Sequence, residues 1–358
     1  MLIALFITVI ALLTHLPAIS GEIPQPQQLL RWNAEASWYY SHNTADNGGY
    51  EFHDLMNTAA RTGAGLNILR GTVELDAERI HGAVSLQYGD IAEAVWGKQF
   101  PIQEGWLGYR ITNNVDLQAG LFLSHFGVEG LRPVENYSGI VSTTGYFDPN
   151  YFGGVKCYIS LSDVTLMHVD VLTSFNGLEI DGEIPALSIN LVHTPDTLTQ
   201  LTLSSILSEE SLHDRRAFQL YTQISGVFHR AAWHLLGELN VGAEIPTSAA
   251  PGFLMTSALL GCYYDLTRTL QCGLRAECVV DPHGIMANDR YASPLPINEL
   301  SAAGVTATVT YSALPWCKVR ADLRRLSAIN SVSVIDANPP VRARTEAVVT
   351  VELYLNSD

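Results

Sequence analysis

Apolar and polar residues alternate along most of this chain with a period of two. In residues 270–278, one face would carry Leu270, Cys272, Leu274, Ala276 and Cys278, and the other Gln271, Gly273, Arg275 and Glu277. Residues 303–311 and 317–324 repeat the pattern. Successive side chains of a β-strand point to opposite faces, so this period predicts strands with one apolar and one polar face.

Sixteen stretches of about ten residues carry this signal. They are 32–41, 66–76, 80–90, 102–111, 115–124, 152–161, 164–173, 184–193, 198–206, 216–224, 228–239, 253–264, 268–279, 302–311, 316–325 and 344–355. The stretch at 164–173 is the least regular, because Thr165 and His168 fall on opposing faces. The sequence therefore predicts an all-β chain of about 16 strands.

Short and long connections alternate between these stretches. The short ones carry turn residues and are predicted at 76–78, 112–114, 162–163, 194–196, 225–226, 265–267 and 312–315. The long ones are rich in Gly, Asn, Asp, Pro and Ser. Short turns on one side and long loops on the other are typical of transmembrane β-barrels, with the short turns in the periplasm and the long loops outside.

Composition narrows the class of protein. The chain has 358 residues, of which 47% are hydrophobic and 16% charged, with a net charge of −16. An apolar content this high argues against a disordered acidic chain, and the acidic balance argues against a nucleic-acid partner. Beyond the N-terminus, no apolar run approaches the roughly 20 residues that a membrane-spanning helix needs.

A soluble β-sandwich or solenoid is the main alternative for alternating strands. Its water-facing side would be rich in Lys and Glu, whereas the polar faces here carry mostly Gly, Thr, Gln, Asn and Ser. Aromatic residues also gather near strand ends on the apolar phase, at Tyr109, Tyr264, Tyr311, Trp38 and Tyr40, as in interfacial girdles. We expect a closed antiparallel transmembrane β-barrel, because an open edge would leave unpaired backbone groups in lipid.

The N-terminal segment is typical of a secretory signal peptide. Residues 2–13 are nearly continuously apolar, and small residues precede a cleavage site between Ser20 and Gly21. A membrane anchor is the alternative, and no Lys or Arg precedes the apolar run. We expect residues 1–20 to be cleaved and 21–358 to form one barrel domain.

The cysteine and histidine residues suggest no covalent chemistry. Five cysteines fall inside predicted strands and are interpreted as small apolar side chains. His229 and His234 are predicted on opposite faces of one strand and so cannot share a metal ion. His234, Glu238 and Arg230 share its polar face, as an ordinary hydrogen-bond network or a proton relay. With no nucleotide, metalloprotease or serine-hydrolase motif, we expect no enzyme, no cofactor and no metal site.

Charged residues on the polar phase are expected to face the barrel lumen. A basic stripe is formed by Arg275, Lys318, Arg320 and Arg324 on the two stretches at 268–279 and 316–325. The other charges predicted to face the lumen are Glu104, Arg110, Asp116, Glu277 and Asp322. Rings and stripes of charge of this kind set ion preference in pores.

Residues 102–138, IQEGWLGYRITNNVDLQAGLFLSHFGVEGLRPVENYS, resemble the signature of the OmpL-like β-barrel porin family. The matching positions are Gln103, Glu104, Gly105, Tyr109, Asp116, Ala119, Gly120, Phe122, Ser124, Gly127, Val128, Glu129, Gly130 and Leu131. The last aromatic residue, Tyr354, departs from the terminal aromatic usual in such barrels.

The resemblance implies an outer-membrane porin in a Gram-negative bacterium. It would be a passive diffusion channel for small hydrophilic solutes or ions, surrounded by outer-membrane lipids and, by analogy, a homotrimer. The alternative is a closed barrel that acts as an adhesin or structural protein through its external loops.

Porins also suggest a role for the third long loop, residues 125–151. In general porins this loop folds inward and narrows the barrel. Here it would bring Glu129, Glu135 and Asp148 opposite the basic stripe and create a transverse field. Alternatively, the loop extends outward and the stripe is balanced by Asp322 and Glu277.

Overall fold

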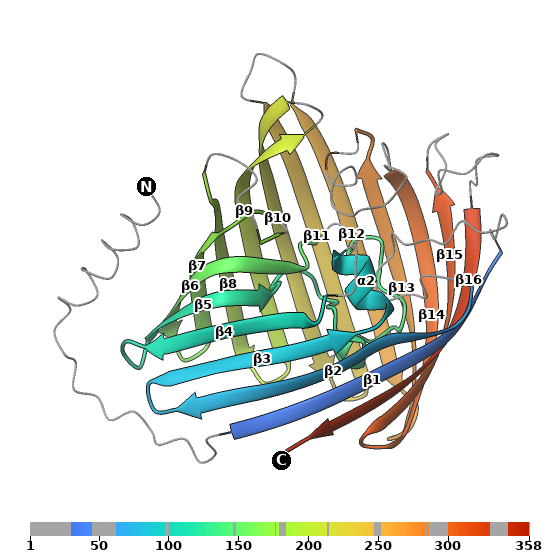
Figure 1. The fold of residues 1–358 in the computed structure, drawn as a ribbon. Helices are drawn as coiled ribbons and strands as arrows, with labels where there is room; N and C mark the ends of the chain where they lie inside the picture. The colour runs from blue at the N-terminus through green and yellow to red at the C-terminus, as the bar shows by residue number, and fades with distance from the viewer. Residues whose placement is uncertain are drawn as a thin grey trace.

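The computed structural model describes residues 30–44, 62–96, 100–145, 148–175, 177–178, 184–212, 215–246, 252–283, 285, 300–329 and 343–357. Sixteen strands are found in these ranges (Figure 1): β1 (Leu30–Asn43), β2 (Gly63–Ala77), β3 (Ile80–Tyr88), β4 (Ile102–Arg110), β5 (Val115–Leu123), β6 (Tyr151–Ser162), β7 (Thr165–Leu172), β8 (Ala186–Asp196), β9 (Thr199–Leu212), β10 (Arg215–Arg230), β11 (Trp233–Pro246), β12 (Phe253–Asp265), β13 (Leu270–Asp281), β14 (Leu300–Leu314), β15 (Cys317–Ala328) and β16 (Ala343–Asn356). The predicted signal peptide lies outside the described residues, and so do many residues of the predicted long loops between strands.

The strands form one closed antiparallel barrel. Each strand pairs with its neighbours in sequence, and β1 pairs with β16 from Asn33↔Asn356 to Asn43↔Glu346 (Figure 1). Closure leaves no sheet edge, so the strands' backbone groups can pair within the wall. The predicted closed barrel of about 16 strands is confirmed. Among the described residues, no helix is long and apolar enough to cross a membrane.

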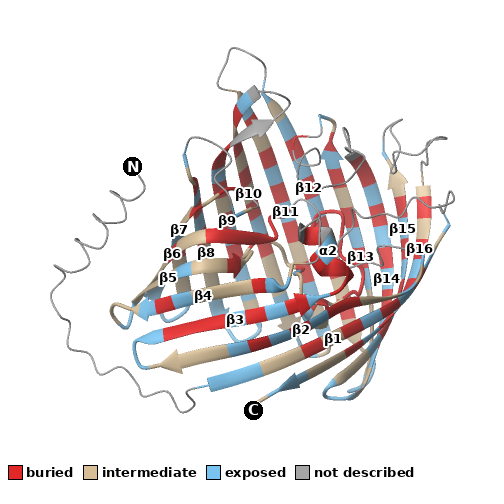
Figure 2. Cartoon of the chain, in the orientation of Figure 1, coloured by how far each residue is buried: buried red, intermediate tan, exposed pale blue. Residues whose placement is uncertain are grey.

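Buried and exposed residues alternate along the strands (Figure 2). Most large exposed side chains of the strands are apolar, and many of the buried ones are polar or charged. On β12, Leu254 and Leu260 are 64% and 66% exposed on the outer face, whereas Ser257 on the inner face is buried. An outer surface this apolar is stable against lipid acyl chains and not against water. Large exposed aromatics near the strand ends include Tyr40 and Tyr109, as the girdle pattern predicts, whereas Trp38 lies near the middle of β1.

Two predicted hairpins are wrong in their turn positions. The expected turn at 194–196 lies at the end of β8, and the chain reverses at residues 197–198. The expected turn at 225–226 lies inside β10, where Gly226 pairs with Gly237 of β11. The chain reverses at residues 231–232, where Ala231 has a left-handed φ of 53°. Ser225 and Gly226 are residue types typical of turns, although they lie in mid-strand, and the true turn at 231–232 contains no such residue. The shift moves His229 from the outer face that was predicted to the inner face, and it moves Arg230 from the inner face to the exposed face.

A short helix, α2 (Asp90–Trp96), follows β3 and was not predicted. Ile91 and Val95 lie one turn apart and pack on Ile68 of β2, which places the helix inside the barrel (Figure 1). The Asp90 carboxylate accepts a short hydrogen bond from the Tyr39 hydroxyl on β1. Seven residues are too few for the period-3.6 signal to emerge from the surrounding sequence.

All five cysteines are free thiols. They lie in strands, as the alternation predicts, and each is half-buried. The residues are Cys157, Cys262, Cys272, Cys278 and Cys317.

The lipid-facing band gives a first prediction. Leu260→Arg, near the middle of β12, should lower the free energy of unfolding by about 2–4 kcal/mol, because a cation at the bilayer midplane is poorly solvated. Leu254→Arg, on the same face near the strand end, should cost only about 0–1 kcal/mol. Urea unfolding in phospholipid vesicles measures both, and equal costs would contradict this placement of the membrane.

Candidate functional site

The segment between β5 and β6 folds into the barrel. We call residues 124–150 the inward loop; all but 146 and 147 are described, and a 3-10 turn, η1 (Pro133–Glu135), lies in it. Its backbone N–H groups donate to side chains of distant strands, including Val128 to Glu238 of β11 at 2.9 Å and Gly139 to Asp322 of β15 at 3.1 Å. The loop therefore contacts the wall on the side opposite its own strands.

The basic stripe holds this loop. Each of its four cations donates a hydrogen bond to a backbone carbonyl of the inward loop. Lys318 Nζ reaches Val134 O at 2.8 Å, Arg320 reaches Pro133 O at 2.8 Å, Arg324 reaches Val141 O at 3.0 Å and Arg275 reaches Ile140 O. Four charge-assisted hydrogen bonds to one loop fix its depth in the barrel.

The three arginines of the stripe also have carboxylate partners. Arg275 pairs with Glu129 of the inward loop, and Arg320 pairs with Glu352 of β16. Arg324 pairs with Glu346 of β16 and lies 3.8 Å from Glu277. All three arginines are fully buried beneath the loop.

Lys318 differs from the arginines of the stripe. It is only half-buried and has no carboxylate within 4.0 Å among the described residues. Most of the positive charge of the stripe is therefore neutralised locally, and the charge of Lys318 is not.

The predicted loop acids separate into three environments. Glu129 reaches the stripe and pairs with Arg275. Glu135 is half-exposed and pairs with Arg132 of the same loop. Asp148 lies away from the stripe, where it accepts hydrogen bonds from Tyr221 and Gln223 of β10 at 2.7 and 2.9 Å.

The five other charges predicted in the lumen all have partners, on the inner wall or on the inward loop. Glu104 pairs with Arg70 at 2.9 Å, Asp116 with His81 at 2.8 Å and Arg110 with Asp76 at 2.7 Å. Glu277 accepts a hydrogen bond from Thr143 N of the inward loop, and Asp322 accepts one from Ser138 Oγ at 2.7 Å. Two of the five thus fasten the loop, alongside the stripe.

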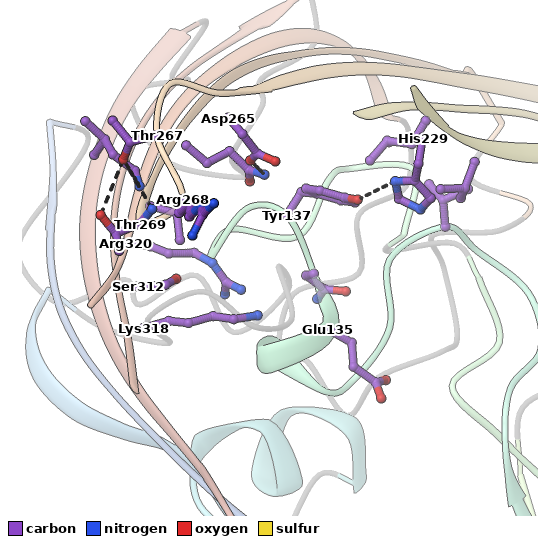
Figure 3. A pocket seen from close by; sticks show the side chains of 17 residues that line it. Glu135, Tyr137, His229, Asp265, Thr267, Arg268, Thr269, Ser312, Lys318 and Arg320 are labelled. Atoms are coloured by element: carbon purple, nitrogen blue, oxygen red, sulfur yellow. Dashed lines mark hydrogen bonds between the residues drawn. The ribbon is translucent and has the colours of Figure 1, made fainter. Parts of the chain in front are cut away.

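A cavity of about 440 Å³ lies between the inward loop and the short-turn end of the barrel (Figure 3). Its charged and aromatic lining comprises Glu135, Tyr137, His229, Asp265, Arg268, Lys318 and Arg320. Tyr137 stacks on Tyr263 of β12 with ring centroids 4.7 Å apart. Burial, with a smaller contribution from Asp265, raises the pKa of Tyr137 to about 12.

The predicted separation of His229 and His234 is wrong. They lie on β10 and β11 as directly paired residues, so both point inward, and their Nδ1 atoms are 2.8 Å apart. His234 Nε2 is 2.8 Å from Asp265 Oδ2, and the Tyr137 hydroxyl lies 3.3 Å from His229 Nδ1 (Figure 3). The misplaced turn hid this network from the sequence pattern.

The family described as "Putative beta-barrel porin-2, OmpL-like" matches residues 30–356. The chain belongs to this family. It is an outer-membrane porin, a barrel for diffusion across that membrane, and the resemblance seen at residues 102–138 is confirmed. Porins of this family and fold are typically channels and not enzymes.

Solved structures share the fold of this porin at low sequence identity. An anion-selective porin from Comamonas acidovorans has a TM-score of 0.61 and 10% identity, covering 92% of this chain and 99% of its own. The outer membrane channel DcaP of Acinetobacter baumannii has a TM-score of 0.61 and 12% identity, covering 91% and 96%. At these identities the likeness concerns the barrel fold. No curated protein matches the sequence.

The buried pairing at the stripe gives a second prediction. Arg275→Ala should destabilise the porin by about 3–5 kcal/mol, because it leaves the buried Glu129 carboxylate without its cation. Arg31→Ala breaks an exposed pair with Glu74 at 3.6 Å and should cost about 0–1 kcal/mol. Urea unfolding in detergent compares the two, and similar costs would contradict a docking role for Arg275.

Proposed function

We propose that the inward loop forms the constriction of this porin and sets which solutes pass. The observation that carries the proposal is the set of hydrogen bonds from all four stripe cations to loop carbonyls. A loop fastened at this depth narrows the lumen permanently, because leaving the wall would strand buried charges.

The proposed ion preference comes from the charges that remain unpaired beside the cavity. Among the described residues, Lys318 and Arg268 line the cavity without an ion-pair partner. Glu135 pairs with Arg132, and the one remaining carboxylate of the lining, Asp265, is hydrogen-bonded to His234 and Gln271. The local excess is therefore positive. An excess of positive charge at a narrow point favours small anions and anionic solutes.

The transverse field expected from the whole stripe is reduced in this proposal. Glu129 neutralises Arg275, and Glu352 neutralises Arg320. These ion pairs therefore serve to hold the loop in place. Lys318 is left as the main source of selectivity, with Arg268 in the turn between β12 and β13.

We also propose that the barrel catalyses no reaction. Ser188 Oγ lies 3.3 Å from His125 Nε2, and His125 Nδ1 lies 3.9 Å from Asp170 Oδ2. This row has the residue types of a hydrolase triad. However, 3.9 Å is too long for the hydrogen bond that orients a catalytic histidine, and Ser188 is buried away from solutes.

Three further expectations belong to the same proposal. The apolar outer face supports direct contact with outer-membrane lipids. Export through a leader cleaved after Ser20 and assembly as a homotrimer follow from the sequence pattern and from analogy with porins. Native mass spectrometry of the detergent-solubilised protein tests the assembly, and N-terminal sequencing of the membrane form tests the cleavage.

Single-channel recording in a planar bilayer tests the channel. The folded protein should give discrete ohmic steps and a reversal potential that favours anions in a salt gradient. Lys318→Gln should move the reversal potential toward cations, because it removes one of the two unpaired cations beside the cavity. Arg325→Gln is the matched control, since Arg325 is exposed on the outer face and donates to Thr345; it should leave the reversal potential unchanged.

The outcomes separate the parts of the proposal. An unchanged reversal potential in Lys318→Gln would reject the selectivity mechanism while leaving the channel intact. A folded barrel without conductance would mean that the inward loop closes the lumen, and the function would then lie in the external loops, as in an adhesin or structural barrel.

A further inference from the structure

A cluster of potential metal ligands lies inside the barrel, away from the basic stripe. His125 comes from the start of the inward loop, and His168 and Asp170 come from β7. The candidate ligand atoms of the three residues all lie within 4.8 Å of one another. The two imidazole rings meet edge to face, with centroids 4.4 Å apart and an interplanar angle of 88°.

Asp170 has an unsatisfied oxygen in this cluster. The residue is fully buried, and its Oδ2 atom has no hydrogen-bond partner. Oδ1 lies 2.8 Å from His168 Nδ1, whereas Oδ2 points toward His125 Nδ1 at 3.9 Å. A buried carboxylate oxygen without a partner costs free energy, which a bound cation would recover.

His125 is held in an orientation suited to coordination. Ser188 Oγ lies 3.3 Å from its Nε2, and its Nδ1 faces both Lys156 Nζ at 3.5 Å and Asp170 Oδ2 at 3.9 Å.

Lys156 is the competing cation. Its Nζ lies 3.5 Å from His125 Nδ1 and 4.7 Å from the centroid of the Phe122 ring, which holds it by a cation–π contact. The ammonium group contributes positive charge near Asp170 without a direct ion pair to it. A metal ion would compete with this ammonium group for the negative charge of Asp170. Lys156 therefore weakens metal binding.

We propose that His125, His168 and Asp170 form a binding site for a divalent transition-metal ion of the zinc type. Two imidazoles and one carboxylate suit Zn²⁺ and its neighbours and leave a fourth position for water. Ser188 is a positioning residue, because it orients the His125 ring from outside the ligand set. Since His125 begins the inward loop and β7 is part of the wall, the ion would tie the loop to the wall at its origin.

Isothermal titration of the refolded full-length barrel with Zn²⁺ tests the site, and visible absorption on titration with Co²⁺ reports the ligand set. We expect saturable binding of one ion per chain. His125→Ala and Asp170→Asn should abolish it or weaken it by at least about tenfold, and Ser188→Ala should weaken it by about 10- to 100-fold. Lys156→Gln should tighten binding, because it removes the competing charge.

His193→Ala is the matched control. His193 lies on the neighbouring strand β8, where its Nδ1 is 3.0 Å from Thr165 Oγ1, outside the cluster. Binding should be unchanged in this variant. Heat-dependent mobility in SDS gels establishes that each variant is folded, and Asp170→Asn, which conserves shape, serves where a histidine variant fails to fold.

Two results would overturn the proposal: a folded wild-type barrel without saturable binding, or binding that His125→Ala and Asp170→Asn leave unchanged. The titration is independent of conductance, so its failure is distinguishable from a failure of the proposed channel function.

Discussion

The structure depends on how a loop backbone can be accommodated inside a barrel. Residues 124–150 bring unpaired N–H and C=O groups into the lumen, and buried backbone groups require partners. The barrel wall supplies these partners from both basic and acidic side chains. Arg320 and Arg324 donate hydrogen bonds to loop carbonyls, while Glu238 and Asp322 accept hydrogen bonds from loop N–H groups. Charged lumen side chains act here first as an anchoring surface.

That anchoring determines the electrostatics of the channel. Cations that donate to the loop are also paired with carboxylates, since an uncompensated buried arginine would be costly. Glu129 has both roles. It neutralises Arg275, and it accepts a hydrogen bond from Ser142 N of the same loop at 2.8 Å. The field at the cavity then depends on the few charges outside these pairs, which is why Lys318 has more influence than the arginines.

The proposed metal site lies at the origin of the same loop. The stripe fastens its middle, from Pro133 to Val141, and His125 lies two residues after β5 ends. A bound ion would add a second attachment made of coordinate bonds, which salt screens less than surface ion pairs. The position of the constriction would thus be held at two separate points of the wall.

The sequence by itself determined the barrel. Strand number, the lipid-facing phase and the inward phase of Arg275 and Lys318 all follow from a local period of two, which backbone geometry imposes on each strand separately. Local signals failed where they were ambiguous: Gly226 imitated a turn, and the irregular stretch at 164–173 hid that His168 and Asp170 share the inner face. Only the tertiary structure decided which lumen charges are neutralised and which residues could bind an ion. Glu129 and Arg275 are 146 positions apart in sequence, and no periodicity carries information across that distance until the barrel closes.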